Sequence, residues 1–507
     1  MRTETPPVLL VADRVRTLAW ALPEARAVLV EDGWIQWVGD QPDDAPRNRA
    51  RRVDLAGALL QPAFVDAHAH LTATGLALGG ADLTMCRSVA DCLAAVQAIA
   101  EITPGEVIWG SGWDDLSYPE RRPPTGDELT QAAGGRPVLL TRVDGHSAVI
   151  DRISLKAAPL ERAEGVERDA SGRPTGLLRK EAVNVARRWF CAELPDAQLA
   201  QARYAIARHA ASLGIASVHE MNGPDQMGAR DFDAWLQGDW PIEVIGYWGA
   251  DDLDFVAARG LRQVGGALHL DGTLGSHTAA LEEDYADAPG AGHLYESDAE
   301  IVAFLIEATR RHFQVGLHCI GDRAVRQAVE VLEAVAGRLG LRAVRAVRHR
   351  LEHCALVPPP LIPRLVTLGV VVSVQPTFDA LWGHRGGLYQ QRLGRQRAER
   401  MNPLGPLAGA GITLAFGSDP SSTLDPWATV SAAVSHHRPE FRIDVSTALQ
   451  AATIGGRRAA RQHRIGPIAV GQRADLAAFA IQGDRAERCV LTMVHGRVVH
   501  GPDDIRS

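Results

Sequence analysis

Eight apolar, strand-like runs are spaced along the chain, and helical patterns separate most of them. The runs are LQPAFVDAHAH (60–70), RPVLLTRVDGH (136–146), GIASVHEM (214–221), GGALHLDG (265–272), FQVGLHCIGD (313–322), VRHRLEHCAL (347–356), GVVVSVQP (369–376) and GITLAFGSD (411–419). Segments such as DAQLAQARYAIARHAASLG (196–214) read as the intervening helices. Strands that alternate with helices favour a parallel sheet, so the order predicts an α/β fold, a (β/α)8 TIM-type barrel. A doubly wound sheet is the structural alternative.

The two ends of the chain look alike. AVLVEDGWIQWVGD (27–40) reads as two strands around Asp32-Gly33, and CVLTMVHGRVVH (489–500) turns at His495-Gly496. Neither end has enough strand for a stable sheet by itself. We therefore expect residues 1–60 and 465–507 to form one small β-sandwich domain. Residues 61–464 would form the barrel, with an insertion at about 72–136 that is rich in Gly, Pro and Trp.

Composition narrows the class of protein. The net charge of −8 argues against a nucleic-acid binder, which normally carries a basic face. No apolar run approaches the ~20 residues of a membrane span, and the first residues lack the features of a signal peptide. The six cysteines show no paired spacing, which fits a reducing compartment. We expect a cytoplasmic protein with a small-molecule substrate and neither nucleic-acid nor membrane partners.

Polar side chains end almost every run. They are Asp66, His68, His70, Asp144, His146, His219, Glu220, His269, Asp271, His318, Glu352, His353, Gln375 and Asp419. In a (β/α)8 barrel the carboxyl ends of the strands meet at the face that carries catalytic groups. A lone histidine is more often structural, but core packing does not explain polar residues at the same end of successive strands. Buried polar groups need partners, and one metal ion would serve several of them.

The pair His68 and His70 is the strongest single signal for a metal. Positions i and i+2 of a strand share a face, so both imidazoles could bind one ion, although a half-buried strand also tolerates histidine. Imidazole with carboxylate suits zinc, iron, manganese or nickel, and we expect zinc. Such a metal activates a bound water near neutral pH. Asp419 and His353 are the candidates for moving its proton.

Several motifs resemble those of the amidohydrolase superfamily. These are FVDAHAH (64–70), QVGLHCIGDRAV (314–325), RLEHCAL (350–356), FGSDP (416–420) and AVGQRADLAAF (469–479), which span nearly the whole chain. A second set is similar to the amidohydrolase-3 branch, which includes N-substituted formamide deformylases and YtcJ-like metal-dependent hydrolases. That set is RVDGHSAVI (142–150), PTGLLRKEA (174–182), DGTLGSHTAAL (271–281) and SVQPT (373–377).

The resemblance implies roles for individual residues. His68, His70, His318 and Asp419 would bind metal, and His353 would be a second-metal ligand or an acid/base. His146 would face the substrate and polarise its carbonyl group. We also expect substrate contacts from Asp271, Gln375, Trp113 and Arg385, and an arginine in a loop over the barrel mouth could grip a carboxylate. A solvated surface role for Arg385 is the alternative. The resemblance is compatible with a homodimer.

One position departs from the family pattern. Binuclear members usually carry a lysine four residues before the Asp of the DG pair, and its carbamate bridges two metals, but this chain has Ala267 there. The chain's two lysines, Lys156 and Lys180, lie far from that strand in sequence, so no carbamylated lysine is expected. We favour one ion over two. In the alternative, His269 holds a second ion or contacts the substrate.

Three functions remain open at this point. The first is a hydrolase that cleaves a C–N bond, in an amide, N-acyl or N-formyl group, by metal-activated water. The second is a mononuclear deaminase of a heterocyclic amine, but the H-x-x-E pattern of such enzymes is absent, because CIGD follows His318. The third is a catalytically silent binding homologue, which the retained histidine set argues against because buried imidazoles without a ligand are costly.

Overall fold

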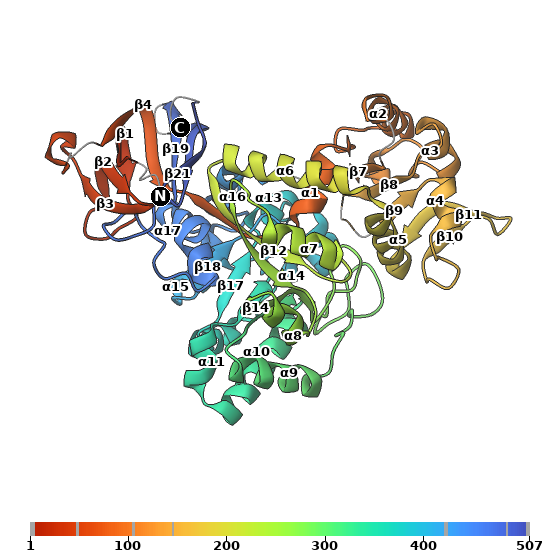
Figure 1. The fold of residues 1–507 in the computed structure, drawn as a ribbon. Coiled ribbons are helices and arrows are strands. Elements are labelled where there is room, and N and C mark those ends of the chain that lie inside the picture. The colour runs from red at the N-terminus through yellow and green to blue at the C-terminus, as the bar shows by residue number, and fades with distance from the viewer. Residues whose placement is uncertain are drawn as a thin grey trace.

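The computed structural model describes residues 6–46, 50–103, 107–143, 145, 147–419, 424–482 and 485–502. Figure 1 shows three bodies: a sheet built from both ends of the chain, a central body of strands and helices, and a lobe that contains β6 to β11. The central body lies between the other two (Figure 1).

Strands from both termini form one sheet in the order β21-β20-β19-β4-β1-β2-β3. They are β1 (Val8–Arg16), β2 (Glu24–Glu31), β3 (Trp34–Gly39), β4 (Arg51–Pro62), β19 (Leu476–Gln482), β20 (Arg485–Val494) and β21 (Arg497–His500). Asp32-Gly33 and His495-Gly496 connect antiparallel neighbours, and all four residues have the positive φ of a type I′ turn. Both expected hairpins are confirmed. The seven strands form one continuous hydrogen-bonded sheet. The strand order alone therefore does not show the two separate layers of the expected β-sandwich.

The eight strands of the central body are parallel and have the arrangement of a TIM-barrel-type α/β fold. Two ladders, β5-β12-β13 and β14 through β18, contain them. The strands are β5 (Phe64–Ala69), β12 (Ile215–Asn222), β13 (Glu243–Trp248), β14 (Gln263–His269), β15 (Gln314–Cys319), β16 (Arg350–His353), β17 (Val371–Val374) and β18 (Thr413–Phe416). β13 lies against β14, and β18 against β5. The Asp419 amide donates to the His68 carbonyl at 2.8 Å, which ties the end of β18 to β5.

Helices connect and cover these strands. They are α1 (Leu71–Leu78), α6 (Asp196–Ser212), α7 (Gly228–Gln237), α8 (Leu253–Ala258), α9 (Asp298–Arg310), α10 (Asp322–Leu339), α11 (Leu341–Val347), α12 (Ile362–Leu368), α13 (Pro376–Trp382), α14 (Leu388–Ala398), α15 (Leu404–Gly409), α16 (Pro426–Val434), α17 (Val445–Gln450) and α18 (Gly456–Ala459). Several begin with a side-chain cap. Asp425 starts α16 by accepting the amides of Trp427 and Ala428.

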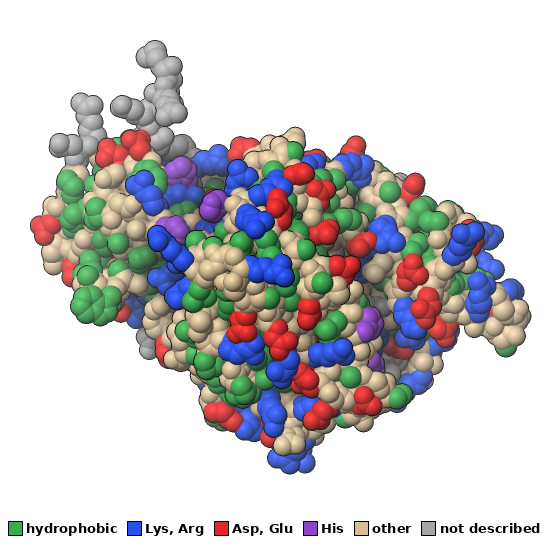
Figure 2. Space-filling view, turned by 90° about the horizontal axis from the view of Figure 1, so that it is seen from below, with side chains coloured by type: hydrophobic (Ala, Val, Ile, Leu, Met, Phe, Trp, Pro, Cys, Tyr) green, Lys and Arg blue, Asp and Glu red, His purple; other side chains and the backbone are tan. Residues whose placement is uncertain are grey.

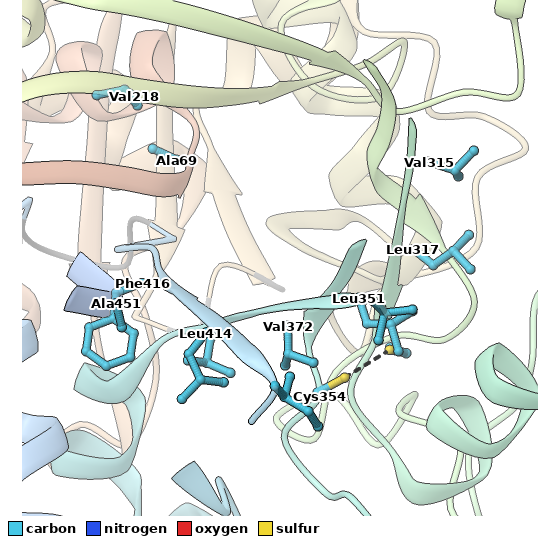
Figure 3. Close-up of a cluster of buried hydrophobic side chains, with 14 of the residues drawn as sticks. Ala69, Val218, Val315, Leu317, Leu351, Cys354, Val372, Leu414, Phe416 and Ala451 are labelled. Atoms are coloured by element: carbon cyan, nitrogen blue, oxygen red, sulfur yellow. Dashed lines mark hydrogen bonds between the residues drawn. The ribbon is translucent and has the colours of Figure 1, made fainter. Parts of the chain in front are cut away.

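An apolar cluster fills the space between the strands and the helices. Leu317 of β15 and Leu351 of β16 are completely buried in it (Figure 3). Cys319 and Cys354 belong to the same cluster, and their sulfur atoms lie 3.8 Å apart. Successive side chains of a strand point to opposite faces, so His318, between Leu317 and Cys319, points away from this cluster. The side chains on the outer face of the strands therefore pack against the helices, and those on the inner face include the polar groups.

The lobe contains a six-stranded sheet in the order β10-β11-β9-β8-β7-β6. Its strands are β6 (Ala81–Asp82), β7 (Ile108–Trp113), β8 (Val138–Arg142), β9 (Ser147–Ile150), β10 (Val166–Arg168) and β11 (Pro174–Arg179). Its helices are α2 (Val89–Ile102), α3 (Gly126–Ala132), α4 (Arg152–Ala157) and α5 (Lys180–Glu193). The insertion therefore extends well beyond its expected end at about residue 136.

One run that we expected in the barrel belongs to this lobe. Residues 136–146 contain β8, which pairs with β7 and β9 rather than with barrel strands. The strand beside β5 is instead β12, and the next one, β13, was not predicted. β13 ends in Trp248 and so lacks the terminal polar group that marked the other strands. Apolar periodicity identifies a buried strand but not the sheet that it joins.

The surface carries both signs of charge. Basic and acidic side chains are interspersed over the face shown in Figure 2. Within the described part of the chain, the helices are all too short or too polar to cross a bilayer.

Candidate metal centre

A cavity of about 530 Å³ lies at the carboxyl ends of the barrel strands, where the inserted lobe meets the barrel. Seven of the predicted site residues line it: His68, His70, His269, His318, His353, Gln375 and Asp419. The lobe contributes a second wall, with Trp109, Thr141, Arg142 and Arg187 among its members. A third wall is apolar and includes Leu274, Ile320, Phe378, Trp382, Leu388 and Met401. The cavity thus joins a polar floor to an apolar side.

His68 and His70, at the end of β5, and Asp419, shortly after β18, form the tightest group on that floor. His70 Nε2 lies 3.5 Å from Asp419 Oδ1, and His68 Nε2 lies 3.9 Å from the same oxygen. The three ligand atoms all lie within 4.8 Å of one another. The spacing that predicted a shared face at positions 68 and 70 therefore brings both imidazoles to one carboxylate.

Hydrogen bonds fix which ring nitrogen of each histidine faces Asp419. His68 Nδ1 lies 2.9 Å from Glu352 Oε2, and His70 Nδ1 lies 2.6 Å from the carbonyl oxygen of Met221. A carbonyl or a carboxylate can only accept, so both Nδ1 atoms carry the proton. The lone pairs of both Nε2 atoms are then directed into the group. This is the usual arrangement of metal-binding histidines, whose other nitrogen donates to an oxygen.

Glu352 owes its charge to a buried arginine. Arg350 donates to Glu352 through Nε at 2.8 Å and through a terminal nitrogen at 3.0 Å. Burial alone would raise the pKa of Glu352, but Arg350 and His68 lower it to about 2. Glu352 therefore stays an anionic acceptor for His68. No role was predicted for Glu352, although its place two residues after Arg350, on the same face of a strand, was a usable signal.

Three more imidazoles continue the floor from His68. The ring centroids of His68 and His353 are 4.9 Å apart, those of His353 and His318 are 4.5 Å apart, and those of His318 and His269 are 4.4 Å apart. His318 Nδ1 is buried and has no hydrogen-bond partner among the described residues. Burial, with the neighbouring imidazoles, lowers the pKa of His318 well below its ordinary value. His318 is therefore a neutral ring with an unsatisfied nitrogen beside the group.

Two site residues adopt strained backbone conformations. His353 has a φ of 70° and Asp419 a φ of 41°, both in the left-handed region that non-glycine residues rarely enter. Regular alternation after Glu352 would turn His353 toward the outer face, so the unusual φ is what lets the ring line the cavity. Strain of this kind concentrates at functional sites.

His353 and Asp419 have opposite protonation tendencies. His353 Nδ1 lies 2.7 Å from Gln375 Oε1 and 3.8 Å from Asp419 Oδ2. Burial lowers the pKa of His353 to about 4 despite the nearby carboxylate. Burial would raise the pKa of Asp419, but His70, His68 and His353 hold it well below its usual range. At neutral pH the pair is a neutral imidazole beside an ionised carboxylate.

These donors fit a divalent cation. Two imidazole Nε2 atoms and one carboxylate oxygen form a ligand set typical of zinc and related metals. His318 lines the same cavity, but its unsatisfied Nδ1 lies 3.6 Å from Asp271 Oδ1 and is not part of this group. Ala267 lines the same cavity at the position of the usual bridging lysine and has no donor atom in its side chain.

Asp271 does not line the cavity among the described residues, contrary to its expected contact with substrate. Its carboxylate accepts the backbone amides of Ala280, Ile320 and Gly321 at 2.8–3.0 Å. It therefore fastens the chain behind His318, whose Nδ1 lies 3.6 Å from Asp271 Oδ1. The sequence placed it correctly at a strand end but could not show which way it points.

Two other expected substrate contacts are also placed elsewhere. Trp113 ends β7 inside the lobe, where it is buried and its indole N–H donates to the Leu140 carbonyl at 3.0 Å. Arg385 is exposed and does not line the cavity formed by the described residues. Trp113, which was expected to contact substrate, is therefore part of a strand with its side chain inside the lobe. His146 lies outside the described residues.

Two cavity residues were missed. Glu220 of β12 accepts the Leu71 amide at 2.6 Å, and burial, with Asp231 nearby, raises its pKa to about 8. Arg187 of α5 reaches the cavity from the lobe. Glu220 was noted only as a strand-end residue. No signal marked Arg187, because a helix in an insertion gives no hint of which cavity it borders.

Comparison with known proteins defines the class. The model of the Amidohydrolase family matches residues 51–500. The chain therefore belongs to the amidohydrolase family and is a hydrolase. The crystal structure of an uncharacterized metal-dependent hydrolase from Pyrococcus furiosus superposes with a TM-score of 0.77 at 25% identity, covering 94% of this chain and 99% of that one.

The same family match and a deformylase relative place the chain in the amidohydrolase-3 branch. N-substituted formamide deformylase of Arthrobacter pascens is 23% identical over 515 residues, which cover 94% of this chain and 93% of that protein. Protein LONG AFTER FAR-RED 3 of Arabidopsis thaliana is 28% identical over 526 residues, which cover 94% and 88%. The resemblance inferred from the sequence motifs is confirmed.

Proposed function

We propose that this hydrolase cleaves a C–N bond of a small molecule, in an amide, N-acyl or N-formyl group, with one divalent metal ion. The observation that carries the proposal is the convergence of His68 Nε2, His70 Nε2 and Asp419 in the cavity, with the other nitrogen of each histidine already bonded. The deformylase relative, which by its name acts on N-substituted formamides, supports the bond type.

His68, His70 and Asp419 would hold the ion, with His318 as the fourth ligand, and we propose zinc. Such an ion supplies Lewis acidity and an activated water. Asp419 takes a proton from the attacking water on Oδ2 and delivers it to the leaving nitrogen. His353 Nδ1 lies 3.8 Å from that oxygen but already donates its proton to Gln375 Oε1, so this neutral imidazole would accept a proton only on Nε2. The apolar wall orients the substituent on the nitrogen.

One ion, rather than two, follows from the side chain at position 267. Ala267 cannot supply the anionic bridge that usually joins two metals. A neutral imidazole at His269 could bind a second ion but could not replace that bridge. We therefore propose that His353 is used for proton transfer and that His269 is a cavity residue.

Two measurements test the proposal together. The metal content per chain is measured by elemental analysis of wild type and of His269→Ala, both purified without chelator. Formate and free amine are then assayed with N-formylbenzylamine and N-acetylbenzylamine. One ion in both proteins, with amine release by wild type, is the expected result. Two ions that fall to one in His269→Ala would overturn the single-ion proposal. Ammonia release from a ring amine, with no amide cleavage, would identify a deaminase instead.

A further inference from the structure

The inserted lobe brings one arginine to the cavity in an unusual state. Arg187 of α5 is half-buried and lines the cavity whose floor holds the histidine group. Its guanidinium donates one hydrogen bond, to the Gly145 carbonyl at 3.1 Å. Among the described residues, no carboxylate lies within ion-pair distance of it. Burial lowers the pKa of Arg187 from its ordinary value, which reflects a charge removed from water without compensation.

The other charged residues of the cavity wall are already neutralised or engaged. Arg142, also on the lobe, pairs with Asp114 at 2.6 Å and Asp115 at 3.1 Å. Asp82 accepts hydrogen bonds from the amide and hydroxyl of Thr84. Glu220 accepts the backbone amide of Leu71 at 2.6 Å. A partly buried cation that has no carboxylate partner among the described residues is costly, so Arg187 has a charge that a ligand could balance.

We propose that Arg187 binds an oxyanion of the substrate, namely a carboxylate. This carboxylate lies at a distance from the C–N bond that is cleaved. This inference rests on the proposed function for the bond type, but not for the presence of the anion. A guanidinium presents its donors as a planar fork that matches a carboxylate or a phosphate. The substrate would then be an amide with three parts: the scissile group over the histidines, an apolar group against Phe378 and Trp382, and an anionic group at the lobe.

The same geometry assigns the lobe a role in substrate selection. The barrel floor supplies the ligands, and the apolar wall comes from segments around α13 and α14. The lobe adds Arg187, a cation without a carboxylate partner in the described part of the chain, from a separate body of the molecule. Substrate selection by charge would thus be carried by the insertion, while the chemistry stays on the barrel.

The test compares three probes of nearly equal size: N-formylphenylalanine, its carboxamide and its phosphonate analogue. Binding to the metal-loaded enzyme is measured by calorimetry, and turnover is measured separately as formate release. Wild type should bind the carboxylate more tightly than the carboxamide. In Arg187→Gln, which keeps a donor for Gly145, the preference for the carboxylate should fall about 10- to 100-fold, the value of a hydrogen bond to a charged group. Arg187→Lys should recover only part of it.

Arg188→Gln is the matched control, because Arg188 is the next residue of α5 and pairs with Asp225 at the exposed surface. It should leave the preference unchanged. Equal binding of carboxylate and carboxamide by wild type, or an equal preference in wild type and Arg187→Gln, would overturn the inference. Tighter binding of the phosphonate than of the carboxylate would overturn the choice of carboxylate. Selective binding without formate release would keep the role of Arg187 and reject the proposed reaction.

Discussion

Two clusters in this molecule combine two histidines with one aspartate, and their spacing is alike. The first is His68, His70 and Asp419 at the barrel mouth. The second is Asp379 of α13 with His436 and His437, just after α16. In each, one ligand atom per residue lies within 4.8 Å of the others. Distance alone would make both of them metal sites.

Hydrogen bonds separate the two clusters. In the second, the Arg438 amide donates to His436 Nδ1 at 3.0 Å, so the neutral ring carries its proton on Nε2. That nitrogen lies 3.1 Å from Asp379 Oδ1 and has no lone pair to offer. The same carboxylate also faces His437 Nδ1 at 2.6 Å and accepts the His437 amide at 3.0 Å. Asp379 is thus already satisfied by groups of the chain.

In the first cluster the ring protons point away from the aspartate instead of toward it. Its histidines donate outward, to Glu352 and to the Met221 carbonyl, and so turn their lone pairs inward. The comparison teaches that a metal site is defined by what bonds to the far side of each ligand as much as by the distances between ligands. The first cluster turns ring lone pairs inward, whereas in the second the carboxylate is engaged by His437, and His436 Nε2, which makes no hydrogen bond among the described residues, carries a proton instead of a lone pair.

Replacing one histidine in each cluster should give the largest difference between the two clusters, in bound metal and in hydrolytic activity. His70→Asn is expected to lose the bound metal and more than about 100-fold of the hydrolytic activity, since even outer partners of a metal ligand are worth up to that factor. His437→Asn should keep the wild-type metal content. Elemental analysis and turnover of both variants check this. Equal loss of metal from the two variants would show that the second cluster also binds an ion.

Removing a buried carboxylate that touches no metal sharpens the comparison. Glu352→Gln should weaken metal affinity about 10- to 100-fold, because His68 loses its anionic partner. It also leaves Arg350 buried without its counter-ion, so the thermal midpoint is measured beside the affinity. Titration with a competing chelator gives the affinity of the folded protein. An unchanged affinity would mean that Glu352 acts on stability alone.

The sequence predicted the first cluster better than the residues that support it. His68 and His70 share a face because they are two residues apart, and Asp419 closely follows β18, the last of the eight parallel strands. Both features can be read from a short stretch of sequence. The role of Glu352 depends on a contact 284 residues away in the chain, between its carboxylate and His68 Nδ1. Likewise, His353 enters the cavity only through its positive φ, which no residue pattern announces.

The fold shows the same division between local and distant information. The two terminal hairpins were predicted because Asp-Gly and His-Gly turns are local signals. β8 was misplaced because a strand of the inserted sheet has the same apolar character as a barrel strand. Arg187 lay outside any prediction, since its position depends on how the lobe sits on the barrel mouth.

The second cluster should matter for stability rather than for metal. Asp379→Asn replaces one of the two buried oxygens that accept hydrogen bonds from His437 with a donor, and it is expected to lower the free energy of unfolding by about 1–3 kcal/mol. Metal affinity and turnover should stay at wild-type values. Chemical denaturation and metal analysis are made on one preparation. A loss of metal with no loss of stability would reverse the roles assigned to the two clusters.

The smallest expected effect is on stability: the contribution of His436, in the second cluster, to the free energy of unfolding should depend on pH. Burial lowers the pKa of His436 to about 4, so the folded state binds fewer protons than the unfolded state once pH falls below the ordinary histidine value. The stabilisation is therefore complete above about pH 6.5 and is lost as pH falls toward 4. Between about pH 7 and pH 5.5 this residue should account for about 1 kcal/mol of the loss. His436→Gln, whose side chain can still accept the Arg438 amide, should show a correspondingly shallower fall of the unfolding midpoint, and His384→Gln at an exposed position is the control. A fall as steep as that of wild type would place the acid sensitivity in another part of the molecule, with the histidines of the first cluster as the next candidates.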